Sequence, residues 1–208
     1  ATKVTKVKTT EYPSSVNRPA NSVLQNKKLL DNFNYKMEDW KVAIRKYLLE
    51  ENKMKRKVLV TGANGYVGRH VVKALLDKGC EVIASDFKFD GVDERAQRNT
   101  TPIFSDEENL YEKLGSPDVV VHLAWRNGFV HNADTHITDL PNHYNFIKKM
   151  VDAKLPQLVV MGTMHEVGYW EGAINGDTPT NPTSMYGIAK NTLREAAYLL
   201  TKGSKTQL

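Results

Sequence analysis

Three glycines, Gly62, Gly65 and Gly68, stand between a short apolar run, residues 58–60, and a helix-like stretch that begins at Tyr66. In a strand–turn–helix unit, the first glycine permits a tight turn, the second lets backbone approach a diphosphate, and the third lets helix and strand pack closely. The free N–H groups and the helix dipole then favour an anion. The pattern predicts a dinucleotide site formed by Gly62, Asn64, Gly65, Tyr66, Val67 and Gly68.

Strand-like and helix-like segments alternate from residue 56 onward, which is typical of a parallel sheet covered on both faces. We expect strands over residues 58–61, 81–85, 102–104, 118–124 and 157–162, and helices over residues 66–78, 107–114, 137–153 and 184–202. Residues 206–208 would begin a sixth strand, where the chain stops. The expected fold class is therefore α/β, a Rossmann-type doubly wound parallel sheet over residues 54–208 that is incomplete at its C-terminus.

Asp86 ends the second expected strand, where a carboxylate accepts hydrogen bonds from the adenosine ribose hydroxyls and repels a 2′-phosphate. This position favours NAD over NADP as the cofactor. Arg69 and Lys88 are nearby cations that would weaken the preference. His122 ends the fourth expected strand, where we interpret it as a packed strand residue rather than an acid or base.

Tyr186 and Lys190 are four residues apart on an expected helix, so their side chains lie on one face, one turn apart. A phenol beside an ammonium group loses its proton more easily than free tyrosine, whose pKa is about 10. Thr163 follows the fifth expected strand, at the sheet edge where open α/β sheets bind ligands. A dinucleotide site together with an activated phenol indicates an oxidoreductase-type active site.

These motifs together resemble the extended short-chain dehydrogenase/reductase family, also described as NAD-dependent epimerases and dehydratases. The glycine loop, the Asp118–Ala124 run, Thr163 five residues before Gly168, and Tyr186-Gly187-Ile188-Ala189-Lys190 carry the resemblance over residues 56–208. The resemblance implies that Leu123 and Ala124 contact the cofactor and that Lys190 holds the nicotinamide ribose. It also implies that Tyr186 exchanges a proton with the substrate while Thr163 positions the reacting oxygen.

Two positions depart from the family pattern. Its dehydratases usually carry Asp-Glu after the catalytic Thr, whereas this chain has Met164-His165. Sugar 4,6-dehydration is therefore disfavoured; Glu166 is a poor replacement, and His165 is either a proton donor or a structural hydrogen-bonding residue. Asp139 stands where the family often has an Asn, which places an anion in the expected proton relay.

The family mostly remodels nucleotide sugars, so the resemblance implies an NAD-dependent nucleotide-sugar epimerase or reductase in polysaccharide sugar biosynthesis. Epimerisation is the first expectation, because Asp86 suits NAD and an epimerase recycles that cofactor within one catalytic cycle. The alternatives are a truncated NAD-binding module without turnover, or a fragment of a dTDP-rhamnose pathway reductase. The resemblance leaves a homodimer open.

Residues 1–53 form a separate N-terminal extension, expected to hold two short helices over residues 22–32 and 37–50, with Asp39 capping the second. Their Arg18-Pro19-Ala20-Asn21-Ser22 run and the Trp40 segment resemble the C-terminal end of dTDP-4-dehydrorhamnose reductases. In those enzymes this end belongs to the substrate-binding lobe.

The composition limits the cellular location and the kinds of binding partner that we expect. Cys80 is the only cysteine, which excludes intrachain disulfides and fits a cytoplasmic location. Residues 1–57 hold 14 Lys and Arg against 6 Asp and Glu, while the rest holds 15 against 18. The basic residues follow no nucleic-acid motif, the histidines have no metal-ligand spacing, and no apolar run is long enough for a membrane span. We therefore expect no nucleic acid, metal or membrane partner.

Overall fold

The computed structural model describes residues 31–34, 36, 39, 41–42 and 56–208, and the chain divides into two compact units, Ala1–Glu51 and Asn52–Leu208. In the first unit, residues 31–33 and 41–42 are helical. Asp39 Oδ1 accepts a hydrogen bond from Lys41 N at 2.9 Å, as expected of a capping residue. The rest of the two expected N-terminal helices lies outside the described residues.

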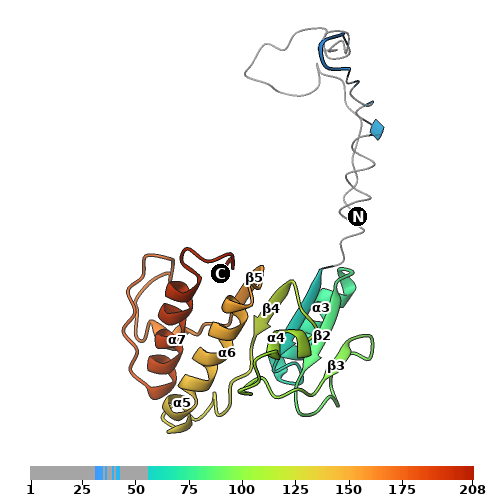
Figure 1. The fold of residues 1–208 in the computed structure, drawn as a ribbon. Helices are drawn as coiled ribbons and strands as arrows, with labels where there is room; N and C mark the ends of the chain where they lie inside the picture. The colour runs from blue at the N-terminus through green and yellow to red at the C-terminus, as the bar shows by residue number, and fades with distance from the viewer. Residues whose placement is uncertain (1–30, 35, 37–38, 40, 43–55) are drawn as a thin grey trace, which may run out of the picture. The chain divides into compact units, whose positions relative to one another are not determined.

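A parallel sheet of five strands forms the centre of the second unit, in the order β3-β2-β1-β4-β5 (Figure 1). The strands are β1 (Lys57–Thr61), β2 (Glu81–Ser85), β3 (Gln97–Asn99), β4 (Val119–His122) and β5 (Gln157–Val160). The strand order reverses at β1, which pairs with β2 on one side and β4 on the other. This is the doubly wound arrangement predicted from the sequence, and ligands bind such sheets beyond the carboxyl ends of the strands at the reversal.

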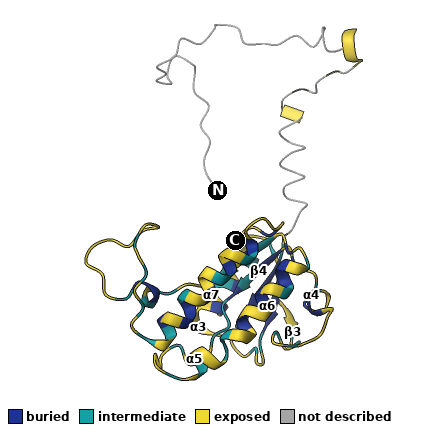
Figure 2. Cartoon of the chain, turned by 60° about the vertical axis from the view of Figure 1, so that its left-hand side comes forward, coloured by how far each residue is buried: buried dark blue, intermediate teal, exposed yellow. Residues whose placement is uncertain are grey.

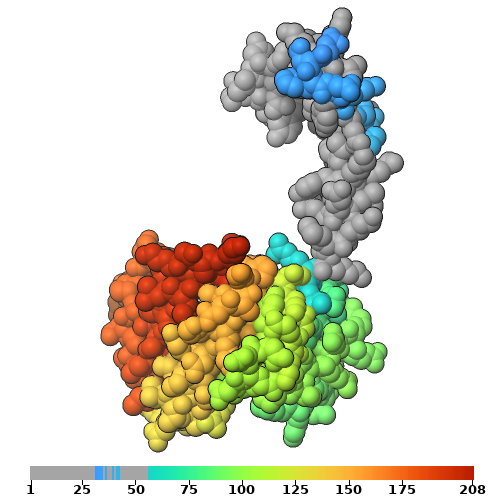
Figure 3. Space-filling view, viewed as in Figure 1, coloured from blue at the N-terminus to red at the C-terminus, as the bar shows by residue number. Residues whose placement is uncertain are grey.

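Helices connect the strands. They are α3 (Tyr66–Asp77), α4 (Leu110–Lys113), α5 (Thr135–Thr138), α6 (Leu140–Asp152), the short 3₁₀ turn η2 (Met164–Glu166) and α7 (Met185–Thr201). Helix α6 packs between α7 and the segment that carries α4, as Figure 3 shows from the outside. Both long helices on this face expose one side and bury the other (Figure 2).

Alternate residues of each strand enter different hydrophobic clusters, because successive side chains point to opposite faces of a sheet. Leu59, Ile83, Val120 and Leu158 pack with Phe146, Ile147 and Leu193 from α6 and α7. Val58, Val60, Val82 and Ala84 pack with Val72 of α3 on the other face. The core therefore lies on both faces of the sheet.

The expected strand over residues 102–104 is wrong. The third strand is Gln97–Asn99, which pairs with β2 from Ile83↔Gln97 to Ser85↔Asn99. This edge strand has two exposed residues and one half-buried residue, so it carries no apolar pattern by which to recognise it. Ile103 and Phe104 are apolar for another reason, since both line a pocket described below.

Helix boundaries also differ from those expected. The helix expected over residues 137–153 breaks at Asp139 into α5 and α6, because Pro141 in the first turn of α6 has no N–H to donate to the carbonyl of Ile137 and so cannot continue α5. The helix expected over residues 107–114 shortens to Leu110–Lys113. Near the C-terminus, Gln207 pairs in parallel with Gln157 of β5, as expected for the start of a sixth strand.

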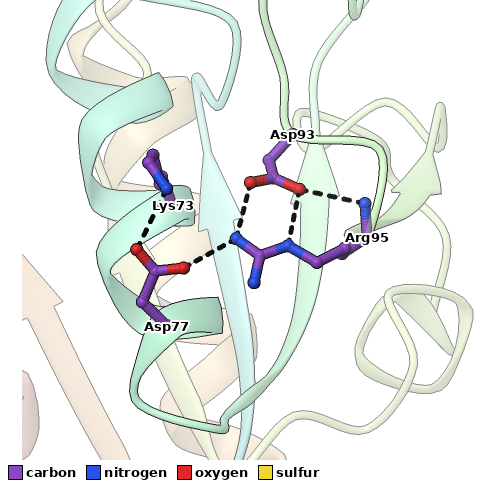
Figure 4. A network of polar contacts seen from close by, with 4 residues as sticks. All are labelled: Lys73, Asp77, Asp93 and Arg95. Carbon is purple, nitrogen blue, oxygen red and sulfur yellow. Dashed lines mark hydrogen bonds and ion pairs between the residues drawn. The ribbon is translucent and has the colours of Figure 1, made fainter.

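An exposed ionic network joins α3 to the segment before β3 (Figure 4). Arg95 donates to Asp93 with Nε at 2.9 Å and with Nη2 at 2.7 Å. The same Nη2 donates to Asp77 of α3 at 2.8 Å, and the other oxygen of Asp77 accepts from Lys73 at 3.0 Å. The network links the connection between β2 and β3 to the helix that follows the glycine loop.

Candidate active site

The glycine loop leaves β1 in a conformation with no room for a Cβ at Gly62 or at Gly68. Gly62 has a φ of +67°, and a Cβ there would lie 2.8 Å from Ala124 N. A Cβ on Gly68 would lie 2.2 Å from Gly62 O, inside the turn itself. Helix α3 thus begins in direct contact with the loop, and the loop contacts the segment after β4.

The N-terminus of α3 is open to an anion. Gly65 is its N-cap and offers no side chain to the first turn. The N–H groups of Tyr66, Val67 and Gly68 have no hydrogen-bond acceptor within the part of the chain that the structure describes. Unsatisfied N–H groups and the positive end of a helix dipole are suited to a diphosphate.

Asp86 is fixed at the end of β2. Its carboxylate accepts hydrogen bonds from Asn64 N at 2.9 Å and Phe87 N at 2.7 Å, and it stays partly exposed. The side chain of Asn64 accepts from Gly91 N at 3.0 Å, which ties the glycine loop to the chain after β2. The acidic residue therefore stands next to the loop that it was predicted to accompany.

A pocket of about 550 Å³ opens beyond the carboxyl ends of β1, β2 and β4. It is lined mainly by apolar and aromatic side chains, with Arg126, Asp139 and His143 at its polar part. Its complete lining is Gly62, Gly65, Asp86, Phe87, Pro102, Ile103, Phe104, Leu123, Ala124, Trp125, Arg126, Asp139 and His143. The predicted cofactor residues Gly62, Gly65, Asp86, Leu123 and Ala124 thus share one pocket with residues that sequence reasoning missed.

Tyr186 and Lys190 lie on α7, in the first two turns. Tyr186 is half-buried, and Lys190 is buried. The indole of Trp125 connects them to the pocket that it lines: its ring centroid lies 6.1 Å from that of Tyr186 and 4.6 Å from Lys190 Nζ. Burial lowers the pKa of Lys190 to about 8, and the negative charge of Glu166 opposes this shift.

Thr163 follows β5 and caps the η2 turn. Its hydroxyl accepts from His165 N at 3.3 Å, and its own N–H donates to Glu166 Oε1 at 2.7 Å. A Cβ on Gly187 would lie 2.3 Å from His165 O, so α7 packs directly against η2. Glu166 is buried in this capping role, and its interpretation as a poor replacement for a dehydratase acid stays a prediction.

The ring of His165 lies among aromatic neighbours. Its centroid is 4.2 Å from that of His131 and 5.6 Å from that of Tyr186. Its side chain has no hydrogen bond within the described residues, so the expected alternative of a structural hydrogen-bonding residue finds no support. His131 also positions α7 directly, because its carbonyl accepts from Tyr186 N at 2.8 Å.

A buried chain of hydrogen bonds runs from β1 to α6. Thr61 Oγ1 accepts from Leu123 N and Ala124 N, each at 3.2 Å, so its hydroxyl proton is left for His122 Nδ1 at 2.8 Å. His122 then donates from Nε2 to His143 Nδ1 at 2.9 Å. The network assigns a neutral tautomer to both rings.

Burial favours the same neutral forms. Burial, with a smaller contribution from the nearby positive charge of Lys190, lowers the pKa of His143 to about 4, and the negative charge of Asp139 opposes this shift. Burial also holds the pKa of His122 well below its usual value, with smaller effects from His143 and Lys190. His122 is therefore packed within the sheet, as the sequence indicated.

Asp139 forms a two-bond ion pair with Arg126, one bond of which joins Nη2 and Oδ1 at 2.7 Å. The anion expected at this position is thus neutralised by a neighbouring cation. Over residues 56–208 and the few described before them, no three His, Cys, Asp or Glu side chains gather closely enough to hold a metal ion.

Comparison with known proteins identifies the family. Residues 58–205 match the model of the NAD dependent epimerase/dehydratase family. The chain belongs to this family. Its cofactor is NAD, and the open N-terminus of α3, the Cβ-free turn at Gly62 and the carboxylate of Asp86 fit that cofactor.

Among curated relatives of this epimerase/dehydratase family member is the dTDP-6-deoxy-L-talose 4-dehydrogenase (NAD(+)) of Aggregatibacter actinomycetemcomitans. It is 40% identical over 147 residues, which cover 68% of this chain and 54% of the relative. The chain therefore spans about half the length of the curated relative.

Solved structures agree in fold. The UDP-glucose 4-epimerase of Thermotoga maritima with UDP-glucose superposes with a TM-score of 0.61 at 22% identity, covering 70% of this chain and 51% of that one. The UDP-glucose 4-epimerase of Thermus thermophilus with NAD gives 0.61 at 20% identity, covering 73% and 52%. At such identities the likeness supports the Rossmann-type fold and not a shared substrate.

Other expectations lie outside these matches. The family match begins at residue 58, so the resemblance of residues 1–53 to dTDP-4-dehydrorhamnose reductases stays a prediction. The homodimer and the cytoplasmic location also stay predictions. Within the described residues, the helices are too short or too polar to cross a membrane.

Proposed function

We propose that the chain is the cofactor-binding and catalytic part of an NAD-dependent dehydrogenase that oxidises the C4 hydroxyl of a dTDP-linked 6-deoxyhexose. The observation that carries the proposal is the placement of Tyr186 and Lys190 against Trp125, which lines the pocket beside the glycine loop. The 40% identical relative named dTDP-6-deoxy-L-talose 4-dehydrogenase (NAD(+)) supports the choice of substrate and reaction.

Oxidation of a secondary alcohol removes a proton from oxygen and a hydride from carbon, leaving a ketone. Bound NAD supplies the hydride acceptor. Tyr186 takes the hydroxyl proton as general base, and the ammonium of Lys190, one turn along α7, stabilises negative charge at the phenol oxygen. The hydroxyl of Thr163 accepts one hydrogen bond, from His165 N, and keeps its proton to donate to the reacting sugar oxygen.

The cofactor would be held by residues on both sides of the strand-order reversal. Gly62, Asn64, Gly65 and Gly68 admit its diphosphate to the α3 N-terminus, where the N–H groups of Tyr66 and Val67 also point. Asp86 accepts from its adenosine ribose, and Lys190 holds its nicotinamide ribose. Leu123 and Ala124 close the pocket between these groups.

A 4-epimerase is the second candidate, favoured by the fold likeness to UDP-glucose 4-epimerases and by the acidic residue that suits NAD. The two reactions differ in the final oxidation state of the cofactor and the sugar. A dehydrogenase releases NADH and a ketone, whereas an epimerase returns the hydride and leaves the cofactor oxidised. The remaining candidate is an NAD-binding module without turnover.

One experiment separates the three candidates. NAD binding is titrated first, and the chain is then incubated with NAD and a panel of dTDP-, UDP- and GDP-sugars while NADH absorbance and sugar chromatography are followed. Stoichiometric NADH with a dTDP-6-deoxyhexose supports the dehydrogenase. A new sugar without NADH would favour the epimerase, and NAD binding without conversion of any sugar would favour the binding module.

A further inference from the structure

Lys190 is a buried cation whose charge has no close anionic partner. Its exposed fraction is 5%, and no carboxylate lies within ion-pair distance of its Nζ among the described residues. Glu166 contributes a longer-range attraction, but its own oxygens are used elsewhere: one accepts from Thr163 N at 2.7 Å, and the other lies 3.6 Å from Arg194 Nε. An unpaired buried ammonium needs another source of stabilisation.

The face of Trp125 provides a contact of the required kind. Lys190 Nζ lies 4.6 Å from the centroid of its ring system, within the range of about 6 Å in which the negative face of an indole attracts a cation. Tryptophan is the strongest of the aromatic side chains in this interaction, and the attraction grows when the cation is removed from water.

Trp125 itself is held by a stacked ring and by a hydrogen bond from its indole nitrogen. It stacks on His143 with ring centroids 4.3 Å apart and planes 18° apart. Its Nε1 donates to His136 Nδ1 at 3.0 Å, so His136 carries its proton on Nε2 and donates it to Val130 O at 2.9 Å. The indole is therefore fixed in both position and tilt.

The buried histidine chain keeps the ring that stacks on Trp125 uncharged. His143 accepts from His122 and has its pKa lowered to about 4, so it is neutral at physiological pH. A cation at His143 would repel the ammonium of Lys190. The titratable groups whose charges act on Lys190 or on the rings beside it are Glu166 of η2, His122 of β4 and His143 of α6, and both histidines are neutral near pH 7. On α7 itself, Tyr186 lies one turn before Lys190, and Arg194, one turn after it, lies 3.6 Å from Glu166.

We infer that Trp125 is a positioning residue for the proposed active site: its indole face holds the ammonium of Lys190 by a cation–π contact in place of an ion pair. Trp125 also makes an edge-to-face contact with Tyr186, with ring centroids 6.1 Å apart and planes 65° apart, so one side chain orients both members of the pair. The inference deepens the proposed function and rests on it for its catalytic meaning, while the contact itself is testable without cofactor or substrate.

The test changes the charge density of the ring with little change in its shape. The chain is produced with tryptophan, 5-fluorotryptophan or more highly fluorinated tryptophans, because each fluorine withdraws electrons from the ring face. Lysine labelled with ¹³C at Cε reports the pKa of each ammonium by NMR titration, and Lys190→Met identifies the signal of Lys190. Each added fluorine should lower the pKa of Lys190, by a total of about 0.5–1 unit over the series.

Trp125→Phe made with the same fluorinated tryptophans is the matched control, since it keeps Trp40 and Trp170 labelled. In that background the pKa of Lys190 should not vary with fluorination. A pKa of Lys190 that stays constant across the series in the unmodified chain, or that falls equally in Trp125→Phe, would overturn the inference.

A kinetic readout separates this inference from the proposed function. If the chain oxidises the sugar, the midpoint of the alkaline limb of its kcat profile should move with the pKa of Lys190 through the series. A series that shifts the pKa of Lys190 while no sugar of any class is converted would support the contact and contradict the proposed activity. A profile that stays fixed while the pKa moves would contradict the positioning role.

Discussion

The two sides of the pocket differ in the chemical groups that they present. On the glycine side, residues 57–99, the functional groups are backbone N–H donors and one carboxylate, and the ionic network of Lys73, Asp77, Asp93 and Arg95 lies in solvent (Figure 4). On the aromatic side, residues 119–201, the groups are buried side chains: Lys190, Glu166 and the histidines packed around Trp125.

Ionisation is controlled differently on the two sides. Hydrogen bonds from Arg95 lower the pKa of Asp93 to about 2, but solvent screens exposed pairs and leaves them little net effect on stability. On the aromatic side, burial is the main cause of the lowered pKa values of Lys190, His122 and His143. We therefore expect substitutions on the glycine side to change cofactor binding, and substitutions on the aromatic side to change turnover and pH dependence.

The largest expected effect is that of Tyr186→Phe on the aromatic side. Removing the general base should lower turnover by about 10²–10⁴-fold, while NAD affinity changes little. Steady-state kinetics and an NAD titration on the same sample measure both. Tyr198→Phe, at an exposed position on the same helix, is the matched control and should keep full activity. Equal turnover in Tyr186→Phe and the unmodified chain would remove the assigned role.

The next effect concerns pH and the buried His143. In the unfolded chain His143 binds a proton near pH 6.5, whereas in the folded chain it stays neutral down to about pH 4. The free energy of unfolding should therefore fall as the pH drops from 6.5 to 4. The loss should be about 3 kcal/mol by pH 4, at 1.36 kcal/mol per pKa unit. Urea unfolding at a series of pH values measures it.

His143→Gln should reduce this dependence by the share of His143 and leave that of the buried His122, and glutamine can still accept the hydrogen bond from His122. His70→Gln on the exposed surface of α3 should leave it unchanged. A free energy of unfolding in the unmodified chain that stays constant from pH 6.5 to pH 4 would contradict the neutral histidine chain.

A smaller effect is expected at Asp86 on the glycine side. Asp86→Ala should reduce the preference for NAD over NADP by about 1–3 kcal/mol, the scale of a charged hydrogen bond lost or left unpaired. Competitive titration of both cofactors checks it. NADP binding as tightly as NAD in the unmodified chain would refute the role of Asp86 and direct attention to Arg69, whose Nε donates to Asn64 O at 2.7 Å.

The smallest effect should come from the exposed ionic network. Arg95→Ala removes three side-chain hydrogen bonds, two to Asp93 and one to Asp77, yet water replaces them, so the melting temperature should not change measurably at physiological ionic strength. Thermal unfolding in low and high salt measures this. A large destabilisation that salt does not reduce would mean that the network holds the glycine side together.

The sequence predicts the glycine side well because its chemistry depends on local backbone conformation. Gly62, Gly65 and Gly68 stand at fixed spacing, and Asp86 follows a strand with a clear apolar pattern. Prediction from the sequence fails at β3, because Gln97–Asn99 is polar and becomes a strand only through its pairing with β2.

The aromatic side is harder to predict because its contacts join distant segments. Trp125 follows the predicted Leu123 and Ala124 directly, but its stacking on His143 depends on how α6 packs. His143 did carry a signal: with Phe146, Ile147, Met150 and Val151 it recurs at helical spacing along the buried face of α6. Arg126 carried no comparable signal, since its partner Asp139 is 13 residues away.

The most direct test of the account follows one hydrogen from sugar to cofactor. The chain is incubated with NAD and the proposed dTDP-6-deoxyhexose carrying deuterium at C4, and both products are analysed by mass spectrometry. A dehydrogenase should give reduced cofactor that contains the deuterium and a 4-keto sugar that has lost it, with neither formed by Tyr186→Phe. Deuterium retained on a sugar of inverted C4 configuration, with the cofactor oxidised and unlabelled, would contradict it and assign the site to epimerisation.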